Sequence, residues 1–174
     1  MSKTDFNLAT IKAVVFDVDG VLSPVCVPMD SDGIPQRMAN LRDGYAIQLA
    51  VKKGVEIAVI SGATQDAVLF RFRNLGVKDV FLTAGSKLDI LKNWMDDKRL
   101  NPENVAYVGD DIPDLGCMKT VGLPVAPADA AIEAKEIAKY ITDANGGYGV
   151  ARELLEQILK VHGLWPSEAN ANGL

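Results

Sequence analysis

The segment VVFDVDGVL, Val14–Leu22, contains the first buried strand and the first acidic residues of the chain. The apolar run Lys12–Val18 predicts a strand inside a sheet. Asp17, Asp19 and Gly20 stand at its carboxyl end. Ligands of an open parallel sheet bind at the carboxyl ends of its strands, so these residues mark a candidate site.

Apolar runs and helical patterns alternate along the rest of the chain. Further strands are expected at Val55–Ile60, Val80–Leu82, Val105–Val108, Leu123–Val125 and Tyr140–Thr142. Helices are expected at Gly44–Lys53, Thr64–Asn74, Lys87–Asp97, Asp129–Ala138 and Val150–Val161, with Asp43 as the cap of the first. The alternation predicts an α/β fold with a doubly wound, mainly parallel, Rossmann-like sheet and helices on both faces.

The segment 22–41 interrupts this alternation after the first strand. We expect a β-hairpin flap, in which Val25–Met29 and Pro35–Asn40 flank the turn Asp30-Ser31-Asp32-Gly33. An isolated hairpin is marginal in water, so pairing with copies from other subunits would bury its apolar side chains, which are Val25, Val27, Pro28, Met29, Ile34 and Met38. A single domain is expected over residues 1–166, with a flexible tail over 167–174.

Composition excludes several classes of function. The 174 residues carry a formal charge of −5 without a basic stripe, which argues against a nucleic-acid partner. No segment approaches the roughly 20 apolar residues of a membrane span, and the N-terminus lacks a signal-peptide pattern, so a cytoplasmic protein is expected. Cys26 and Cys117 form no CxxC pair, and the single histidine, His162, leaves no cluster for zinc.

Chemically useful side chains follow the other strands as well. Ser61 and Gly62 follow the second strand, Lys87 begins the helix after the third, and the fourth is followed by Gly109, Asp110, Asp111 and Asp114. Converging carboxylates repel each other unless a cation or proton intervenes, and an oxygen-rich site favours Mg²⁺. A carboxylate can also attack phosphorus, which makes Asp17 a candidate nucleophile.

Other kinds of site that contain acidic residues fit this sequence less well. An EF-hand that starts at Asp17 would need an oxygen ligand at Val21, glycine at Leu22 and glutamate at Pro28. The turn that starts at Asp30 fails at its twelfth position, Leu41. A phospho-receiver domain remains an alternative, but it places its phosphorylated aspartate after the third strand and its acidic pair after the first.

Four ordered motifs resemble those of the haloacid dehalogenase superfamily: VVFDVDGVL, VISG (Val59–Gly62), Lys87 and YVGDDIPD (Tyr107–Asp114). The resemblance extends over nearly the whole chain. It is closest to the capless 3-deoxy-D-manno-octulosonate 8-phosphate phosphatase family, whose own segments look like NLRDGYAI (Asn40–Ile47), LPVAPADA (Leu123–Ala130) and GGYGVARE (Gly146–Glu153).

The resemblance implies a Mg²⁺-dependent phosphatase of lipopolysaccharide precursor synthesis that assembles as a homotetramer. Asp17 would be the nucleophile and Asp19 the general acid/base, while Ser61 and Lys87 would hold the transferring phosphoryl group. Mg²⁺ would be bound by the carboxylates of Asp17 and Asp110 and by the main-chain carbonyl of Asp19. Asp111 and Asp114 would support Lys87 or metal-bound water.

The substrate is less constrained than the chemistry. The family commonly has arginines at two positions where this chain has Ala63 and Gln48. Arg71 is therefore expected to clamp the substrate carboxylate, from the same or a neighbouring subunit. The expected substrate contacts are Asp19, Asn40, Leu41, Arg42, Asp43, Gly44, Gln48, Gly62, Arg71 and Lys87. A nine-carbon sialic-acid-type 9-phosphate is the alternative substrate, and a non-catalytic regulatory homologue is the alternative to an enzyme.

Overall fold

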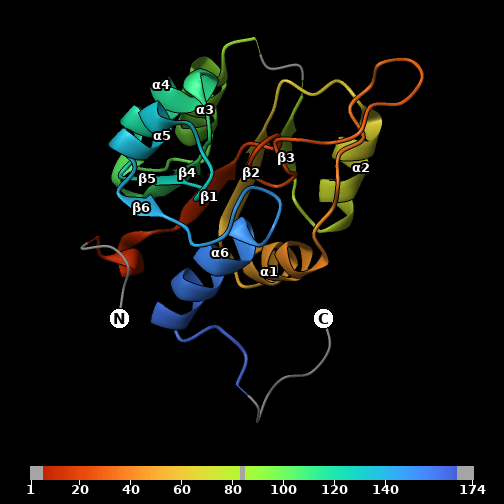
Figure 1. Ribbon diagram of the computed structural model, residues 1–174. Helices are drawn as coiled ribbons and strands as arrows, with labels where there is room; N and C mark the ends of the chain where they lie inside the picture. The colour runs from red at the N-terminus through yellow and green to blue at the C-terminus, as the bar shows by residue number, and fades with distance from the viewer. Residues whose placement is uncertain (1–5, 83–84, 168–174) are drawn as a thin grey trace.

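The computed structural model describes residues 6–82 and 85–167. Its centre is a six-stranded sheet in the order β3-β2-β1-β4-β5-β6, in which every neighbouring pair is parallel (Figure 1). The strands are β1 Ala13–Phe16, β2 Glu56–Ile60, β3 Asp79–Phe81, β4 Val105–Val108, β5 Leu123–Ala126 and β6 Tyr140–Ile141. The predicted α/β fold is confirmed.

Helices cover both faces of the sheet (Figure 1). They are α1 Leu41–Lys52, α2 Asp66–Asn74, α3 Lys87–Asp97, α4 Leu115–Thr120, α5 Ile132–Ile137 and α6 Val150–Val161. Alternate strand residues point to opposite faces. Val14 and Phe16 therefore pack with α1, α2 and α6, whereas Ala13 and Val15 pack with α3, α4 and α5.

The strand register brings the predicted site together. Phe16 is paired with Val59 of β2 and with Val108 of β4, so three strands end close to one level. The chain moves from β1 to β2 on one side and later returns to β4 on the other side of β1. This change of direction is the kind of switch point where open α/β sheets bind ligands.

The limits of α3, β4 and α6 are those predicted, and the other boundaries move by a few residues. The short helix α4 was not predicted. The cap of the first helix was also assigned wrongly to Asp43, because α1 begins at Leu41 with Asn40 as its cap. The Asn40 side chain accepts from the backbone N–H groups of Arg42 at 2.9 Å and Asp43 at 3.2 Å.

The flap, residues 22–41, reverses direction but forms no regular strand. Its arms share a single antiparallel bridge between Met29 and Pro35. Asp30 holds the turn, since its Oδ1 accepts from Asp32 N at 3.0 Å and Ile34 N at 2.9 Å. Prolines lack the N–H that a ladder needs, and Pro28 and Pro35 stand in the two arms. The flap is therefore an irregular excursion rather than the two-stranded hairpin expected.

Two observations concern the ends of the chain. His162, directly after α6, has its Nε2 3.1 Å from the carbonyl oxygen of Ile11. Nearly all of the predicted flexible tail, residues 168–174, falls outside the described residues. Across the described part of the chain, no helix has the length and apolar character to cross a membrane.

Candidate active site

Asp17 lies directly after β1 and is 6% exposed. Its Oδ1 accepts from Val18 N at 2.7 Å, and its Oδ2 lies 2.9 Å from Nζ of Lys87, the first residue of α3. The same ammonium lies 2.8 Å from Asp114 Oδ1. Lys87 therefore joins two carboxylates that come from different strand ends.

Asp114 is almost completely buried and is fixed from three directions. Its Oδ1 accepts from the Tyr107 hydroxyl at 2.8 Å as well as from Lys87, and its Oδ2 accepts from Asp110 N at 3.2 Å. The structure thus brings Asp114 to Lys87, as the resemblance implied. The exposed Asp111 instead caps the short turn after β4, where its Oδ1 accepts from Ile112 N at 2.8 Å.

Carboxylate oxygens of Asp17, Asp110 and Asp114 all lie within 4.8 Å of one another. Burial, followed by the charge of Asp114, raises the pKa of Asp17 to about 7, although Lys87 opposes the shift. Burial and the charges of Asp114 and Asp111 raise the pKa of Asp110 to about 7. A dication would relieve this repulsion, and an all-carboxylate donor set suits Mg²⁺.

Gly20 shows how closely this site is packed. It has a φ of +77°, and a Cβ atom at this position would stand 1.9 Å from Asp110 Oδ2. Only glycine lets the chain after β1 pass so near the carboxylate. The residues present therefore fit a bound Mg²⁺.

Asp19 faces the flap. Arg37 Nε donates to its Oδ1 and Arg37 Nη2 donates to its Oδ2, both at 2.8 Å. Arg37 Nη1 also donates to Gln65 Oε1, just before α2. Arg37 is not predictable as a site residue from the sequence, because its only signal is one cation within an irregular insertion.

A hollow of about 440 Å³ opens over Asp17 and Lys87. Of the predicted residues, it is lined by Asp17, Asp19, Gly62 and Lys87. Ser61 precedes Gly62 but does not itself line the hollow; it is 1% exposed, and its Oγ accepts from Ala63 N at 3.1 Å. The Ser61 hydroxyl still has a proton to donate.

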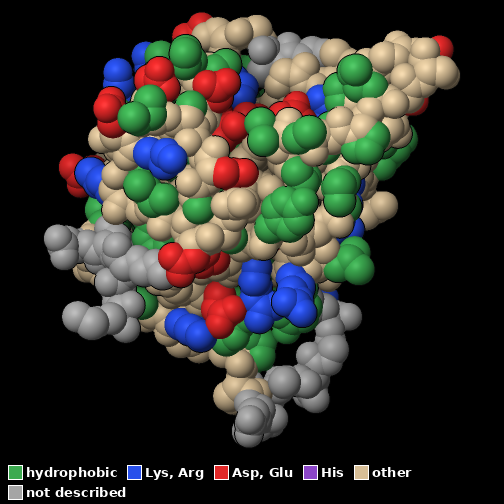
Figure 2. Space-filling view, in the orientation of Figure 1, with side chains coloured by type: hydrophobic (Ala, Val, Ile, Leu, Met, Phe, Trp, Pro, Cys, Tyr) green, Lys and Arg blue, Asp and Glu red, His purple; other side chains and the backbone are tan. Residues whose placement is uncertain are grey.

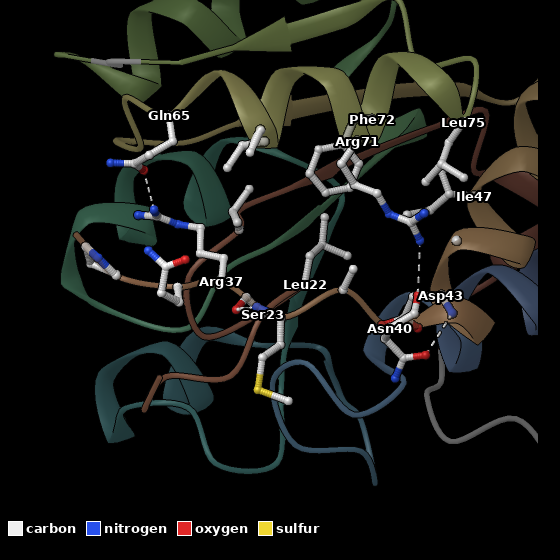
Figure 3. A pocket seen from close by; sticks show the side chains of 18 of the residues that line it. Leu22, Ser23, Arg37, Asn40, Asp43, Ile47, Gln65, Arg71, Phe72 and Leu75 are labelled. Atoms are coloured by element: carbon white, nitrogen blue, oxygen red, sulfur yellow. Dashed lines mark hydrogen bonds between the residues drawn. The ribbon is translucent and has the colours of Figure 1, made fainter. Parts of the chain in front are cut away.

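A second cavity, of about 430 Å³, lies between the flap, α1 and α2 (Figure 3). Four predicted substrate contacts line it: Asn40, Asp43, Gly44 and Arg71. The Arg71 guanidinium packs over Gly44, where a Cβ atom would stand 2.3 Å from Nη2. Figure 3 shows Arg37 at one end of this cavity and Arg71 at the other, with apolar side chains between them.

Three predicted substrate contacts lie elsewhere. Leu41 and Arg42 line a separate hollow with Tyr148 and Arg152, and Asn40 lies at the edge of both spaces. Gln48 is half-buried and lines none of the cavities described here among residues 6–82 and 85–167. The expected contacts are therefore spread over three neighbouring spaces, and Gln48 lines none of them.

Asp43, which lines the cavity under the flap, also makes a contact between two helices. It is 3% exposed, and its Oδ1 accepts from Arg152 N at 2.7 Å in the first turn of α6. Burial raises the pKa of Asp43 to about 6. The carboxylate thus joins the beginning of α1 to the beginning of α6.

Curated relatives cover most of the chain. The 3-deoxy-D-manno-octulosonate 8-phosphate phosphatase KdsC of Salmonella typhi is 37% identical over 153 residues, which are 88% of this chain and 81% of the relative. The chain belongs to this phosphatase family. The broader family of haloacid dehalogenase-like hydrolases matches residues 79–154, from β3 into α6, a range that contains Lys87 and the motif Tyr107–Asp114 but not the two earlier motifs.

Solved structures of the phosphatase family have the same fold. The enzyme from Yersinia pestis is 33% identical with a TM-score of 0.86, and the match covers 90% of this chain and 85% of that one. The enzyme from Moraxella catarrhalis, solved with magnesium, phosphate and KDO, is 29% identical with a TM-score of 0.83, and the match covers 88% of each chain.

Proposed function

We propose that this chain is a Mg²⁺-dependent phosphatase that hydrolyses 3-deoxy-D-manno-octulosonate 8-phosphate to the sugar acid and phosphate, in lipopolysaccharide precursor synthesis. One observation carries the proposal. Asp17 forms an ion pair with Lys87 at 2.9 Å and lies beside Asp110 at the edge of the sheet. The chain is also 37% identical to a 3-deoxy-D-manno-octulosonate 8-phosphate phosphatase. A carboxylate nucleophile, an ammonium group and a metal site are the parts that phosphoryl transfer needs.

In the first displacement, an Asp17 oxygen attacks phosphorus while the bond from phosphorus to the sugar oxygen breaks. Asp19 gives a proton to the leaving alcohol, and the phosphoryl group remains on Asp17 as an aspartyl-phosphate. Lys87 and the Ser61 hydroxyl hold the phosphoryl oxygens. The Asp17 and Asp110 carboxylates and the Asp19 carbonyl would hold Mg²⁺, which would supply positive charge to neutralise the phosphoryl oxygens.

In the second displacement, the Asp19 carboxylate takes a proton from water as that water attacks phosphorus. The bond from phosphorus to Asp17 breaks, and inorganic phosphate leaves. Asp19 keeps this proton for the next leaving alcohol, so the cycle consumes one water and restores Asp17 as a carboxylate and Asp19 as an acid. Asp114, held by Tyr107, keeps Lys87 in place through both steps.

The cavities favour a substrate with negative charge at two ends. The hollow over Asp17 and Lys87 suits the phosphate, and Arg71 lies opposite Arg37 at the end of the cavity between the flap, α1 and α2 (Figure 3). A guanidinium can bind both oxygens of a carboxylate, so Arg71 is the proposed clamp for the 2-keto acid. A nine-carbon acid 9-phosphate has the same two charges and remains the alternative substrate.

Phosphate release with Mg²⁺ tests this proposal. The 8-phosphate should give a higher kcat/KM than the nine-carbon 9-phosphate or a hexose phosphate. Arg71→Ala should weaken the preference for acids, whereas Arg73→Ala, which removes an exposed arginine of the same helix, should leave it intact. Hexose phosphates that match the keto acids would contradict the substrate, and an unchanged preference in Arg71→Ala would contradict the clamp.

We also propose a homotetramer assembled through the flap, in the cytoplasm. Val25, Met29 and Met38 are 69%, 71% and 52% exposed. Figure 2 shows hydrophobic side chains gathered on the face that carries the flap. Light scattering should find a tetramer that Met29→Glu weakens. Ile132→Glu, at an exposed apolar residue of α5, should leave the tetramer intact. An active wild-type monomer would contradict the assembly.

A further inference from the structure

We propose that Arg37 of the flap is a positioning residue for Asp19, and that it directs the Asp19 carboxylate at the leaving oxygen. This inference rests on the proposed function, in which Asp19 protonates the departing alcohol. The Arg37 fork donates one hydrogen bond to each Asp19 oxygen, both at 2.8 Å. A bidentate guanidinium fixes the plane and direction of a carboxylate as well as its position.

Arg37 is itself held from two elements. Its Nη1 donates to Gln65 Oε1 (Figure 3). Gln65 stands at the cap position of α2 but makes no capping hydrogen bond, so its side chain serves the arginine instead. The neighbouring backbone is anchored too, because Met38 N donates to the buried Ser23 Oγ at 3.0 Å.

The position of the pair distinguishes it from an ordinary surface ion pair. Fully exposed pairs contribute little, but this pair is partly sheltered: the Arg37 side chain is 14% exposed and the Asp19 side chain 50%. Arg37 lines the cavity between the flap, α1 and α2, and Asp19 lines the hollow that contains Asp17 and Lys87. Their contact therefore lies where the two spaces meet. A substrate with its phosphate over Asp17 and its sugar in the cavity under the flap would place its ester oxygen at this boundary.

The chemistry of the first displacement makes the role testable. When the ester bond breaks, its electron pair stays on the leaving oxygen, which takes the proton of Asp19. An alkyl alcohol needs that proton, whereas p-nitrophenolate is stable without it. If Asp19 is no longer placed correctly, kcat/KM should therefore fall most for the substrates whose leaving groups are most basic.

The experiment measures kcat/KM over a series of aryl phosphates with graded leaving groups and a primary alkyl phosphate. Arg37→Met should lower the alkyl value about 10- to 100-fold and the p-nitrophenyl value less than about threefold. The dependence of kcat/KM on leaving-group basicity should become steeper than in the wild type and approach the dependence found for Asp19→Asn. Gln65→Leu should shift it in the same direction by less, and Arg37→Lys, which restores the charge without the fork, should lie between Arg37→Met and wild type.

Two results would overturn the inference. One is an equal loss on every substrate in Arg37→Met, which a general effect on structure would give. The other is no loss at all. If Asp19→Asn steepens the dependence and Arg37→Met does not, the Arg37 role alone is wrong. An unchanged dependence in Asp19→Asn would contradict the role of Asp19 in the proposed function, and the positioning role with it.

Discussion

The ammonium of Lys87 lies 2.9 Å from the carboxylate of Asp17. Burial acts to lower the pKa of Lys87, but the charges of Asp17 and Asp114 outweigh it, so the pKa is raised. Lys87 therefore stays charged at neutral pH. The pair places a fixed positive charge beside the proposed nucleophile, where negative charge on the phosphoryl oxygens must be neutralised.

Lys87→Met should lower kcat about 10²- to 10³-fold, because it removes that charge. Lys92→Met, at an exposed lysine of the same helix, is the matched control and should retain wild-type kinetics. Steady-state phosphate release measures both variants. Equal activities in the two would remove Lys87 from the mechanism.

The raised pKa values of Asp17 and Asp110 predict how Mg²⁺ stabilises the protein. Both lie near 7, above the ordinary 3.8, so the metal-free folded state holds protons that the unfolded chain releases. The stability contribution of these groups therefore falls as pH rises from about 4 to about 7. Because Mg²⁺ binds the ionised carboxylates, the increase in Tm that it causes should grow over the same range.

Thermal unfolding with and without Mg²⁺, at several pH values, measures this effect. Asp110→Asn should reduce the Mg²⁺-induced shift in Tm and raise the Mg²⁺ concentration needed for activity. A shift that is the same at all pH values, or larger in acid, would show that these carboxylates do not bind the ion.

Gly20 and Gly33 form a matched pair, since each has a φ of +77°. Alanine at either position should cost about 1 kcal/mol from left-handed backbone strain. Nothing lies within 4 Å of a Cβ at Gly33, but at Gly20 the added atom would meet Asp110 Oδ2. Mg²⁺ titration of activity should therefore find weaker binding in Gly20→Ala and unchanged binding in Gly33→Ala. If Gly20→Ala and Gly33→Ala require similar Mg²⁺ concentrations, then the packing of Asp110 against Gly20 does not affect metal binding.

Asp43→Ala should destabilise the fold by about 1–2 kcal/mol, because it removes the acceptor for Arg152 N at the beginning of α6. Asp43→Asn keeps an acceptor oxygen and should lose less. Asp66→Ala, at an exposed acidic residue in the first turn of α2, is the control. Urea unfolding gives the three free energies. A loss in Asp43→Ala no larger than in Asp66→Ala would exclude the capping role.

The sequence predicted the parts of the molecule that depend on local pattern. The apolar runs that become β1 and β4 predicted the strands, and parallel strand ends placed Asp17, Lys87 and Asp110 at one edge. What it missed depends on contacts distant in the chain. Asp43 was read as a cap of its own helix because its partner, Arg152, is 109 residues away.

The flap is a second case in which local sequence pattern did not predict the structure. Its apolar residues and turn predicted a hairpin, but proline in both arms prevents a regular ladder. Arg37 gave no signal because its role depends on how the flap folds back to Asp19 and Gln65. Motif spacing thus predicted the cluster of Asp17, Lys87 and Asp110, whereas residues that reach this cluster from an irregular segment required the structure.

Covalent attack by Asp17 is the central claim, and rapid acid quench tests it most directly. Enzyme mixed with 3-deoxy-D-manno-octulosonate 8-phosphate and Mg²⁺ should be stopped within one turnover, digested, and analysed by peptide mass spectrometry. The account predicts one added phosphoryl group on Asp17, and neither label nor turnover in Asp17→Asn. Full product formation with no phosphorylated peptide, or a phosphoryl group on another residue, would contradict it.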